Sequence, residues 1–242
     1  MSLGFGFSAR VGQLYPSGGL CDFEPQLMAP DGVQFLTTRM TFKRSGLEDD
    51  IAFVKDLETH AALLADAQVD LIAMNCTAAS LVAGPENVNR RILAATGIRS
   101  ITTIEAVMGA MKATGMKRIG LMTPYVDEVV AAEVEYLNQQ GYEVVARAGR
   151  PCHTPIEQGS LTPDTWLQHA RSFRGKDIDG LLISCAGIQI APVLAQIESE
   201  LGVPVVTSNQ ALLWACLGLC GVETSSHGYG RLLEGYYGRF DR

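Results

Sequence analysis

The chain has 242 residues, of which 47% are hydrophobic and 19% charged, and its formal net charge is -7. The acidic balance argues against nucleic acid or an anionic membrane surface as a partner. We find neither an uncharged apolar run of about 18 residues nor a charged leader followed by an apolar one, so we expect no membrane span, no signal peptide and a cytoplasmic protein.

Strand and helix patterns alternate along the first half of the chain. We predict a strand at 10–16, a long helix at 47–68, a strand at 69–76, a helix at 85–97, a strand at 98–103 and a helix at 104–115. Apolar residues at helical spacing indicate the helices. The continuous apolar run that ends at Cys76 is typical of a strand buried on both faces of a parallel sheet.

The second half repeats this series. We predict strands at 117–125, 142–149, 178–185 and 203–209, and helices at 126–141, 163–177, 190–202 and 210–221. Arg10 and Cys76 are 66 positions apart, and Arg118 and Cys185 are 67 apart. Segments 97–115 and 202–221 also match in pattern. We interpret the halves as an internal duplication of a β/α unit.

Duplication of a β/α unit predicts an α/β fold with two pseudo-symmetric lobes, each a small parallel sheet flanked by helices. We expect the first lobe to comprise residues 1–100 and 210–242, and the second 101–209. Ligands of open parallel sheets bind beyond the carboxyl ends of the strands. Cys76 and Cys185 stand at such ends, so we expect the two thiols on opposite walls of one cleft between the lobes.

A thiol on each wall suits a reaction that exchanges protons between two faces of a carbon. The thiolate is the reactive form, and we expect nearby helix N-termini to lower the pKa of each thiol. The amides that follow the cysteines suit a carboxylate or an enediolate formed from it. These candidate substrate-binding residues are Thr77, Ala78, Ala186 and Gly187.

Two further loops follow the first strand of each half and should join the cleft by symmetry. The candidates there are Pro16, Ser17 and Gly18 in the first loop and Thr123 and Tyr125 in the second. The glycine lets the backbone approach a ligand. The hydroxyl groups of Ser17, Thr123 and Tyr125 suit carboxylate oxygens, although Ser17 and Thr123 also fit a purely turn-capping role. No phosphate-loop or dinucleotide fingerprint, no CxxC pair and no clustered histidines occur, so we expect no cofactor and no metal.

These segments resemble the aspartate/glutamate racemase superfamily, in the branch of maleate cis-trans isomerases and arylmalonate decarboxylases. The resemblance is carried by RVGQLYPS, TTRMTF, VDLIAMNCTAAS, KRIGLMTPYVDEV, DGLLISCAGI and LGVPVVTSNQALLW, and covers nearly the whole chain. It implies two lobes and no cofactor. It also implies catalysis by two cysteines, which match Cys76 and Cys185. In the resembling decarboxylases the first of these positions is Gly, so Cys76 favours an isomerase or racemase.

One loop departs from the pattern of the resembling maleate isomerases. They carry an Asn in the first loop, whereas this chain has Gly18 and Gly19 there. The expected function is therefore a cofactor-independent isomerase or racemase of a small carboxylate or dicarboxylate. Two other enzyme functions stay open as alternatives, an arylmalonate-type decarboxylase and an amino-acid or hydantoin racemase. A third alternative is a two-lobed protein that binds a small ligand without chemistry. A homo-oligomer is compatible with each of these functions.

The remaining cysteines fit a structural role. Cys216 and Cys220 lie four residues apart in an apolar helical segment, and Cys152 has no partner in the pattern, so all three are expected to be buried as small hydrophobic residues. A structural role is also expected for Cys21, with the alternative that it approaches the cleft, because it closely follows the first loop.

Overall fold

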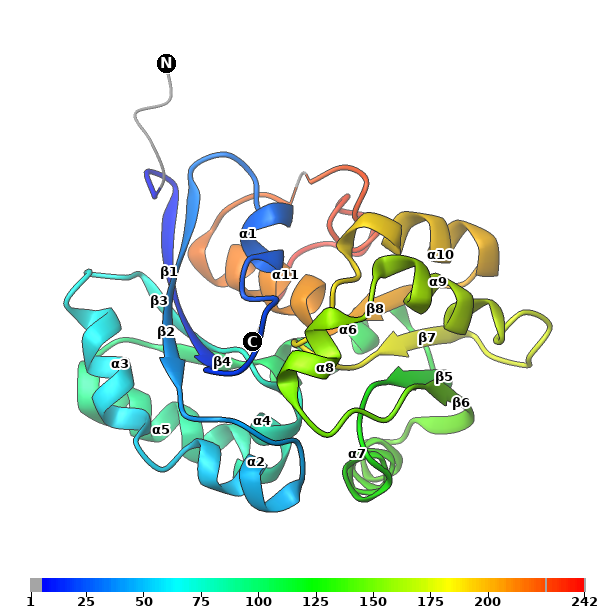
Figure 1. The fold of residues 1–242 in the computed structure, drawn as a ribbon. Coiled ribbons are helices and arrows are strands. Elements are labelled where there is room, and N and C mark those ends of the chain that lie inside the picture. Colours follow the sequence, from blue (N-terminus) through cyan, green and yellow to red (C-terminus); the bar gives the residue numbers. More distant parts are fainter. Residues whose placement is uncertain (1–5, 225, 242) are drawn as a thin grey trace.

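The computed structural model describes residues 6–224 and 226–241, and it consists of two α/β lobes side by side (Figure 1). The first lobe contains β1 (Ala9–Pro16), α1 (Glu24–Met28), β2 (Val33–Met40), α2 (Leu47–Phe53), α3 (Leu57–Ala65), β3 (Leu71–Met74), α4 (Thr77–Ala83), α5 (Pro85–Thr96) and β4 (Ser100–Thr102). Helix α6 (Thr103–Thr114) then leads to the second lobe.

The second lobe contains β5 (Arg118–Thr123), α7 (Asp127–Gln139), β6 (Glu143–Gly149), α8 (Pro155–Ser160), α9 (Pro163–Arg171) and β7 (Gly180–Ile183). It continues with the 3-10 helix η1 (Ala191–Val193), α10 (Leu194–Leu201) and β8 (Val205–Thr207). Helix α11 (Ser208–Cys220) follows β8 and also contacts α1 and β3 of the first lobe.

Each lobe has one four-stranded sheet, and the two sheets have the same strand order. The orders are β2-β1-β3-β4 and β6-β5-β7-β8, and all pairings are parallel. The prediction of two lobes with parallel sheets is confirmed. The central strands β3 and β7 are fully buried, as the continuous apolar runs indicated.

Helices α6 and α11 occupy equivalent places after the last strand of each sheet and pack against each other (Figure 1). Both begin with a capping box, Thr102 with Glu105 and Thr207 with Gln210, which satisfies the first free amides of each helix. The core between the sheets is centred on this helix pair. The limits of the lobes, expected at residues 100 and 209, stay a prediction. Strand β4 pairs with β3 through Thr102, so the first sheet extends two residues beyond the expected limit at residue 100.

The structure differs from the sequence prediction at several elements, most of them in the first lobe. The helix expected at 47–68 is two helices, because the chain leaves helical geometry between Phe53 and Leu57. Strand β2 and the short helices α1, α4 and α8 were not predicted. Strand β2 lies at a sheet edge and is mostly half-buried or exposed, so its sequence lacks the apolar run of a central strand.

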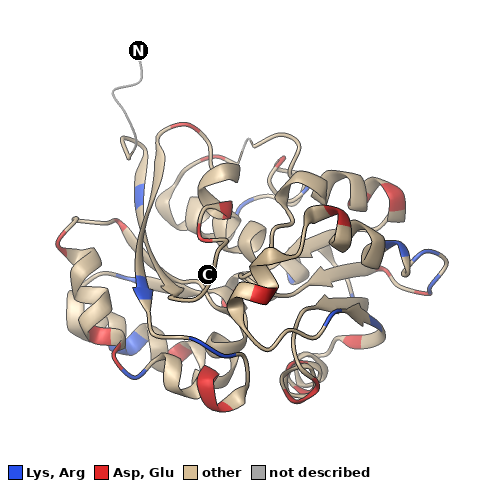
Figure 2. Cartoon of the chain, viewed as in Figure 1, with Lys and Arg blue, Asp and Glu red and all other residues tan. Residues whose placement is uncertain are grey.

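Acidic and basic residues are interspersed over the outer helices and loops in the view of Figure 2. Among the described residues, no helix is both long and apolar enough to cross a membrane.

Candidate active site

A cleft lies between the lobes and is lined by residues of both. Eight of the residues expected there from the sequence line it: Pro16, Cys76, Thr77, Ala78, Tyr125, Cys185, Ala186 and Gly187. The structure therefore brings the two candidate cysteines into one cavity, as the duplication predicted. In the described part of the chain, no group of three or more His, Cys, Asp or Glu residues is arranged to hold a metal.

Cys76 stands between β3 and α4. It is the N-cap residue of α4, in extended conformation, and its side chain is buried. The first amides of any helix have no acceptor within the helix, so those of Thr77 and Ala78 are available at this end of the cleft. Burial raises the pKa of the Cys76 thiol well above its ordinary value, and the charge of Asp50 raises it further.

Cys185 follows β7 at the equivalent position of the second lobe. Its sulfur accepts a hydrogen bond from the Gly187 amide at 3.2 Å and donates one to Oε1 of Gln158 at 3.6 Å. Burial raises the pKa of the Cys185 thiol to about 12, although the Gly187 amide and the Tyr125 hydroxyl act in the opposite direction. An amide oxygen can only accept, so the contact with Gln158 fits the protonated thiol.

The expectation that both thiol pKa values are lowered is wrong for the net effect. The amide of Ala79 in the first turn of α4 does lower the pKa of Cys76, but burial outweighs it, and the pKa of each thiol is raised. Both sulfurs are buried away from water, and no Lys, Arg or His is among the described residues that line the cleft. Desolvation then favours the neutral thiol. In addition, Cys185 is not followed directly by a helix, because η1 begins only at Ala191.

Three other expected binding residues do not line the cleft. The Ser17 hydroxyl accepts the Phe42 amide at 3.1 Å, and the Gly18 amide donates to the Phe42 carbonyl at 3.1 Å. The Thr123 hydroxyl accepts the Tyr125 amide at 3.2 Å. Their polar groups hold the loops in shape, so the turn-capping alternative describes Ser17 and Thr123 better.

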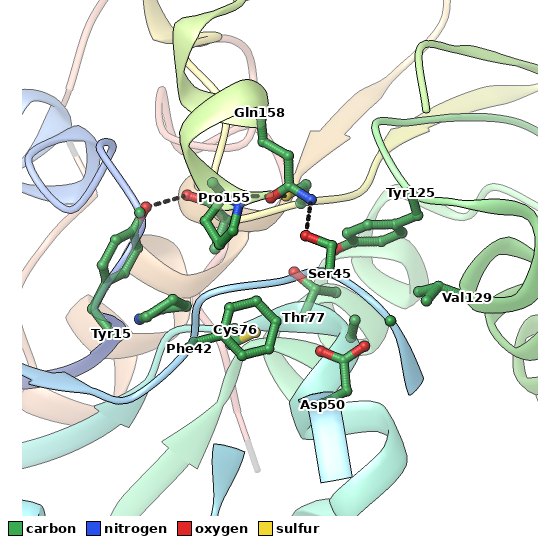
Figure 3. Close-up of a pocket in the computed structure, with 17 residues that line it drawn as sticks. Tyr15, Phe42, Ser45, Asp50, Cys76, Thr77, Tyr125, Val129, Pro155 and Gln158 are labelled. Carbon is green, nitrogen blue, oxygen red and sulfur yellow. Dashed lines mark hydrogen bonds between the residues drawn. The ribbon is translucent and has the colours of Figure 1, made fainter. Parts of the chain in front are cut away.

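Several residues that line the cleft were missed from the sequence, and three of them join the lobes. The Tyr15 hydroxyl donates to the carbonyl of Ala186 at 3.2 Å, and Nε2 of Gln158 donates to Oγ of Ser45 at 3.0 Å (Figure 3). The Ser45 amide also donates to the His153 carbonyl at 2.9 Å. No local pattern signals these contacts, because each joins segments more than 100 positions apart.

Asp50 is the acidic residue among those that line the cleft, and it was also missed. It belongs to a run of three acidic residues in the first turn of α2, a common arrangement at helix N-termini. Only the tertiary structure distinguishes it from Asp49, because Asp50 is the one that points inward and is 2% exposed.

A buried polar network lies directly behind the two cysteine loops. Asn75, which precedes Cys76, donates through Nδ2 to Gln13 at 2.9 Å and to Asn209 at 3.0 Å. Ser208 accepts the Cys185 amide at 3.0 Å and the Thr77 hydroxyl at 2.8 Å. Satisfied buried networks of this kind fix local geometry, so the two cysteines are held in a defined relative position.

Cys21 contacts the second cysteine loop from outside the cleft. Its buried thiol donates to the Gly187 carbonyl at 3.3 Å, and its amide donates to the Tyr15 hydroxyl at 3.1 Å. Cys21 is absent from the residues that line the cavity. It supports the loop and does not extend the wall.

The fold and the cleft define a class of two-lobed α/β protein with a cysteine at the end of the third strand of each lobe. A family model described as arylmalonate decarboxylase matches residues 12–233. The chain therefore belongs to the arylmalonate decarboxylase family.

Individual relatives carry two different names. The chain is 27% identical to a maleate isomerase of Pseudomonas putida, over 94% of this chain and 98% of the relative. It is 26% identical to an arylmalonate decarboxylase of Bordetella bronchiseptica, over 90% and 93% of the two chains. A solved structure of Nocardia farcinica maleate cis-trans isomerase, a cysteine-to-serine variant with a covalently bound succinylcysteine intermediate, has a TM-score of 0.86 at 23% identity, covering 93% and 98% of the chains.

Proposed function

We propose that the protein is a cofactor-independent isomerase or racemase of a small carboxylate or dicarboxylate, and that Cys76 and Cys185 perform the chemistry. The observation that carries this proposal is the presence of both thiols in one cleft, at equivalent positions of the two lobes. A protein that only binds its ligand has no need for two buried thiols at the reacting carbon. The maleate isomerase names among its relatives support the same reaction class.

Each cysteine has a distinct role in this proposal. The Cys76 sulfur adds to the reacting carbon or removes its proton, and the Cys185 thiol supplies a proton on the opposite face. The contact of the Cys185 thiol with the Gln158 oxygen supports the donor role, since it is the protonated form that makes this bond. The succinylcysteine of the Nocardia relative is a precedent for covalent attachment in this fold.

The raised pKa values determine how the reaction begins. Burial raises the pKa of both thiols, so the neutral forms are favoured in the free enzyme. In the proposed reaction the Cys76 proton passes to water or to the substrate carboxylate. The thiolate that remains adds to the carbon or removes its proton, while Cys185 gives its own proton to the opposite face. The free amides of Thr77 and Ala78 lie where negative charge would then form, and they would stabilise a bound carboxylate or the enediolate derived from it. The proposed binding residues are those that line the cleft: Pro16, Thr77, Ala78, Tyr125, Ala186 and Gly187.

A decarboxylase is the second candidate, and two observations favour it. The family model carries that description, and a protonated Cys185 is already suited to deliver a proton to a carbanion. In this reading one thiol suffices and Cys76 is not required for turnover.

Separate Cys76→Ser and Cys185→Ser variants distinguish the two candidates. The wild type would be incubated in buffered D2O with maleate, 2-substituted malonates, amino acids and hydantoins, and followed by proton NMR, which reports isomerisation, exchange and decarboxylation together. We expect each variant to lose more than the roughly 10²–10³-fold typical of a lost transition-state donor. Full turnover by Cys76→Ser, with Cys185→Ser inactive, would reject the two-cysteine mechanism in favour of decarboxylation.

We also propose that the protein acts in the cytoplasm. All six cysteines are free thiols, which is the state that a reducing compartment maintains.

A further inference from the structure

Asp50 presents an unpartnered carboxylate to the cleft. Its side chain is 2% exposed and lines the same cavity as Cys76 and Cys185 (Figure 3). Its backbone amide donates to the Gly46 carbonyl at 2.9 Å. Within residues 6–224 and 226–241, no hydrogen bond or ion pair to the carboxylate is found, and its oxygens are not among the fully buried polar atoms that lack a partner, so they face the cleft. Buried carboxylates are normally paired, because an unpaired one loses its hydration without compensation.

The surroundings of Asp50 are also negative. Asp49 precedes it on α2, and α7 contributes Glu128 and Glu133. The other titratable groups that interact with Asp50 are the Cys76 thiol at the start of α4 and the Tyr125 hydroxyl, and neither is a cation. Arg44 pairs with Asp49 at 3.7 Å on the exposed side of α2, outside the cleft. A second anion brought to this part of the cleft would therefore be opposed by charge, whereas a cation would be favoured.

We propose that Asp50 determines substrate specificity by accepting a hydrogen bond from a cationic nitrogen of the substrate. Such a substrate supplies the Asp50 carboxylate with a partner and neutralises its charge inside the cleft. A second substrate carboxylate placed beside Asp50 is rejected when Asp50 is ionised. This inference rests on the proposed function, because it concerns the substrate of the same cleft.

The protonation state of Asp50 makes the specificity depend on pH. Burial, together with the charges of Asp49, Glu128 and Glu133, raises the pKa of Asp50 to about 7. Below that pH the neutral acid can donate a hydrogen bond and tolerates a second carboxylate. Above it, the anion repels a carboxylate and binds a cationic group, so the preference for the cation strengthens as the pH rises.

Two small probes of matched length test the inference by binding alone. Succinate has a carboxylate at each end, whereas β-alanine has an ammonium group in place of one carboxylate. Calorimetric titration of the wild-type protein at pH 6 and pH 8 gives the affinity for each. Since hydrogen bonds to charged groups contribute about 1.5–3 kcal/mol, we expect β-alanine to bind roughly 10–100-fold more tightly than succinate at pH 8, with a smaller ratio at pH 6.

Variants of two adjacent carboxylates complete the test. Asp50→Asn should remove both the preference for β-alanine and its dependence on pH. Asp49→Asn, which removes a neighbouring charge outside the cleft, should keep the preference. Succinate binding as tightly as β-alanine to the wild type at pH 8, or an unchanged preference in Asp50→Asn, would overturn the inference. Neither probe needs to react, so these outcomes are separate from the turnover that tests the cysteines.

Discussion

Glu133 is a buried acid next to the second cysteine loop, and its replacement by Gln should stabilise the protein at high pH. The side chain is 2% exposed. One carboxylate oxygen accepts the Ser184 hydroxyl, and the other, Oε2, has no hydrogen-bond partner in the described part of the chain. Burial raises the pKa of Glu133 from 4.5 to about 7, against the opposing effect of Ser184.

The direction of the pH effect follows from this raised pKa. Between about pH 4.5 and 7 the folded protein holds the proton on Glu133 and the unfolded chain does not, so the free energy of unfolding falls as the pH rises. At about 1.4 kcal/mol for each pKa unit, the full cost above pH 7 is roughly 3 kcal/mol. Gln keeps an oxygen that can accept the Ser184 hydroxyl and carries no charge, so Glu133→Gln removes this cost.

Urea unfolding at pH 5 and pH 8 measures the effect. We expect Glu133→Gln to match the wild type within about 1 kcal/mol at pH 5 and to exceed its free energy of unfolding by roughly 2–3 kcal/mol at pH 8. Glu135→Gln is the control, because Glu135 is exposed on the same helix, and it should show no such difference. A Glu133→Gln protein no more stable than the wild type at pH 8 would refute the reasoning that the folded state holds an uncompensated carboxylate.

Two further predictions concern the cleft. Burial raises the pKa of Cys185 to about 12, so the reactive thiolate is scarce at neutral pH. The rate of its alkylation by iodoacetamide should therefore increase about tenfold per pH unit from pH 7 to 9, measured by mass spectrometry of the peptide that contains it. A rate that does not depend on pH would contradict a raised pKa. Tyr15→Phe removes the hydroxyl that joins Cys21 and Ala186 across the lobes, so urea unfolding should show a loss of about 1–3 kcal/mol, whereas Tyr236→Phe, at an exposed position, should cost nothing measurable.

The amino-acid sequence by itself determined the repeated architecture and the place of both cysteines. The apolar runs before Cys76 and Cys185 have the composition that only doubly buried strands need, and their nearly equal spacing from Arg10 and Arg118 revealed the duplication. These signals are local or periodic, so they can be recognised in the amino-acid sequence without a structure. The edge strand β2 was not predicted, because a half-exposed strand has no such apolar run.

The tertiary structure decided the character of the cleft. The pKa of a thiol depends on how much water and which charges surround it. Residues of both lobes determine this environment of Cys76. The argument from the helix N-terminus alone therefore gave the wrong direction for its pKa. Asp49 and Asp50 are equivalent in the sequence, and only the packing of α2 against α4 turns one of them into the cavity, where Glu128 and Glu133 of α7 act on its charge. The contacts of Tyr15 and Gln158 likewise join distant segments, and no local pattern of residues encodes a contact that exists only after the lobes have packed together.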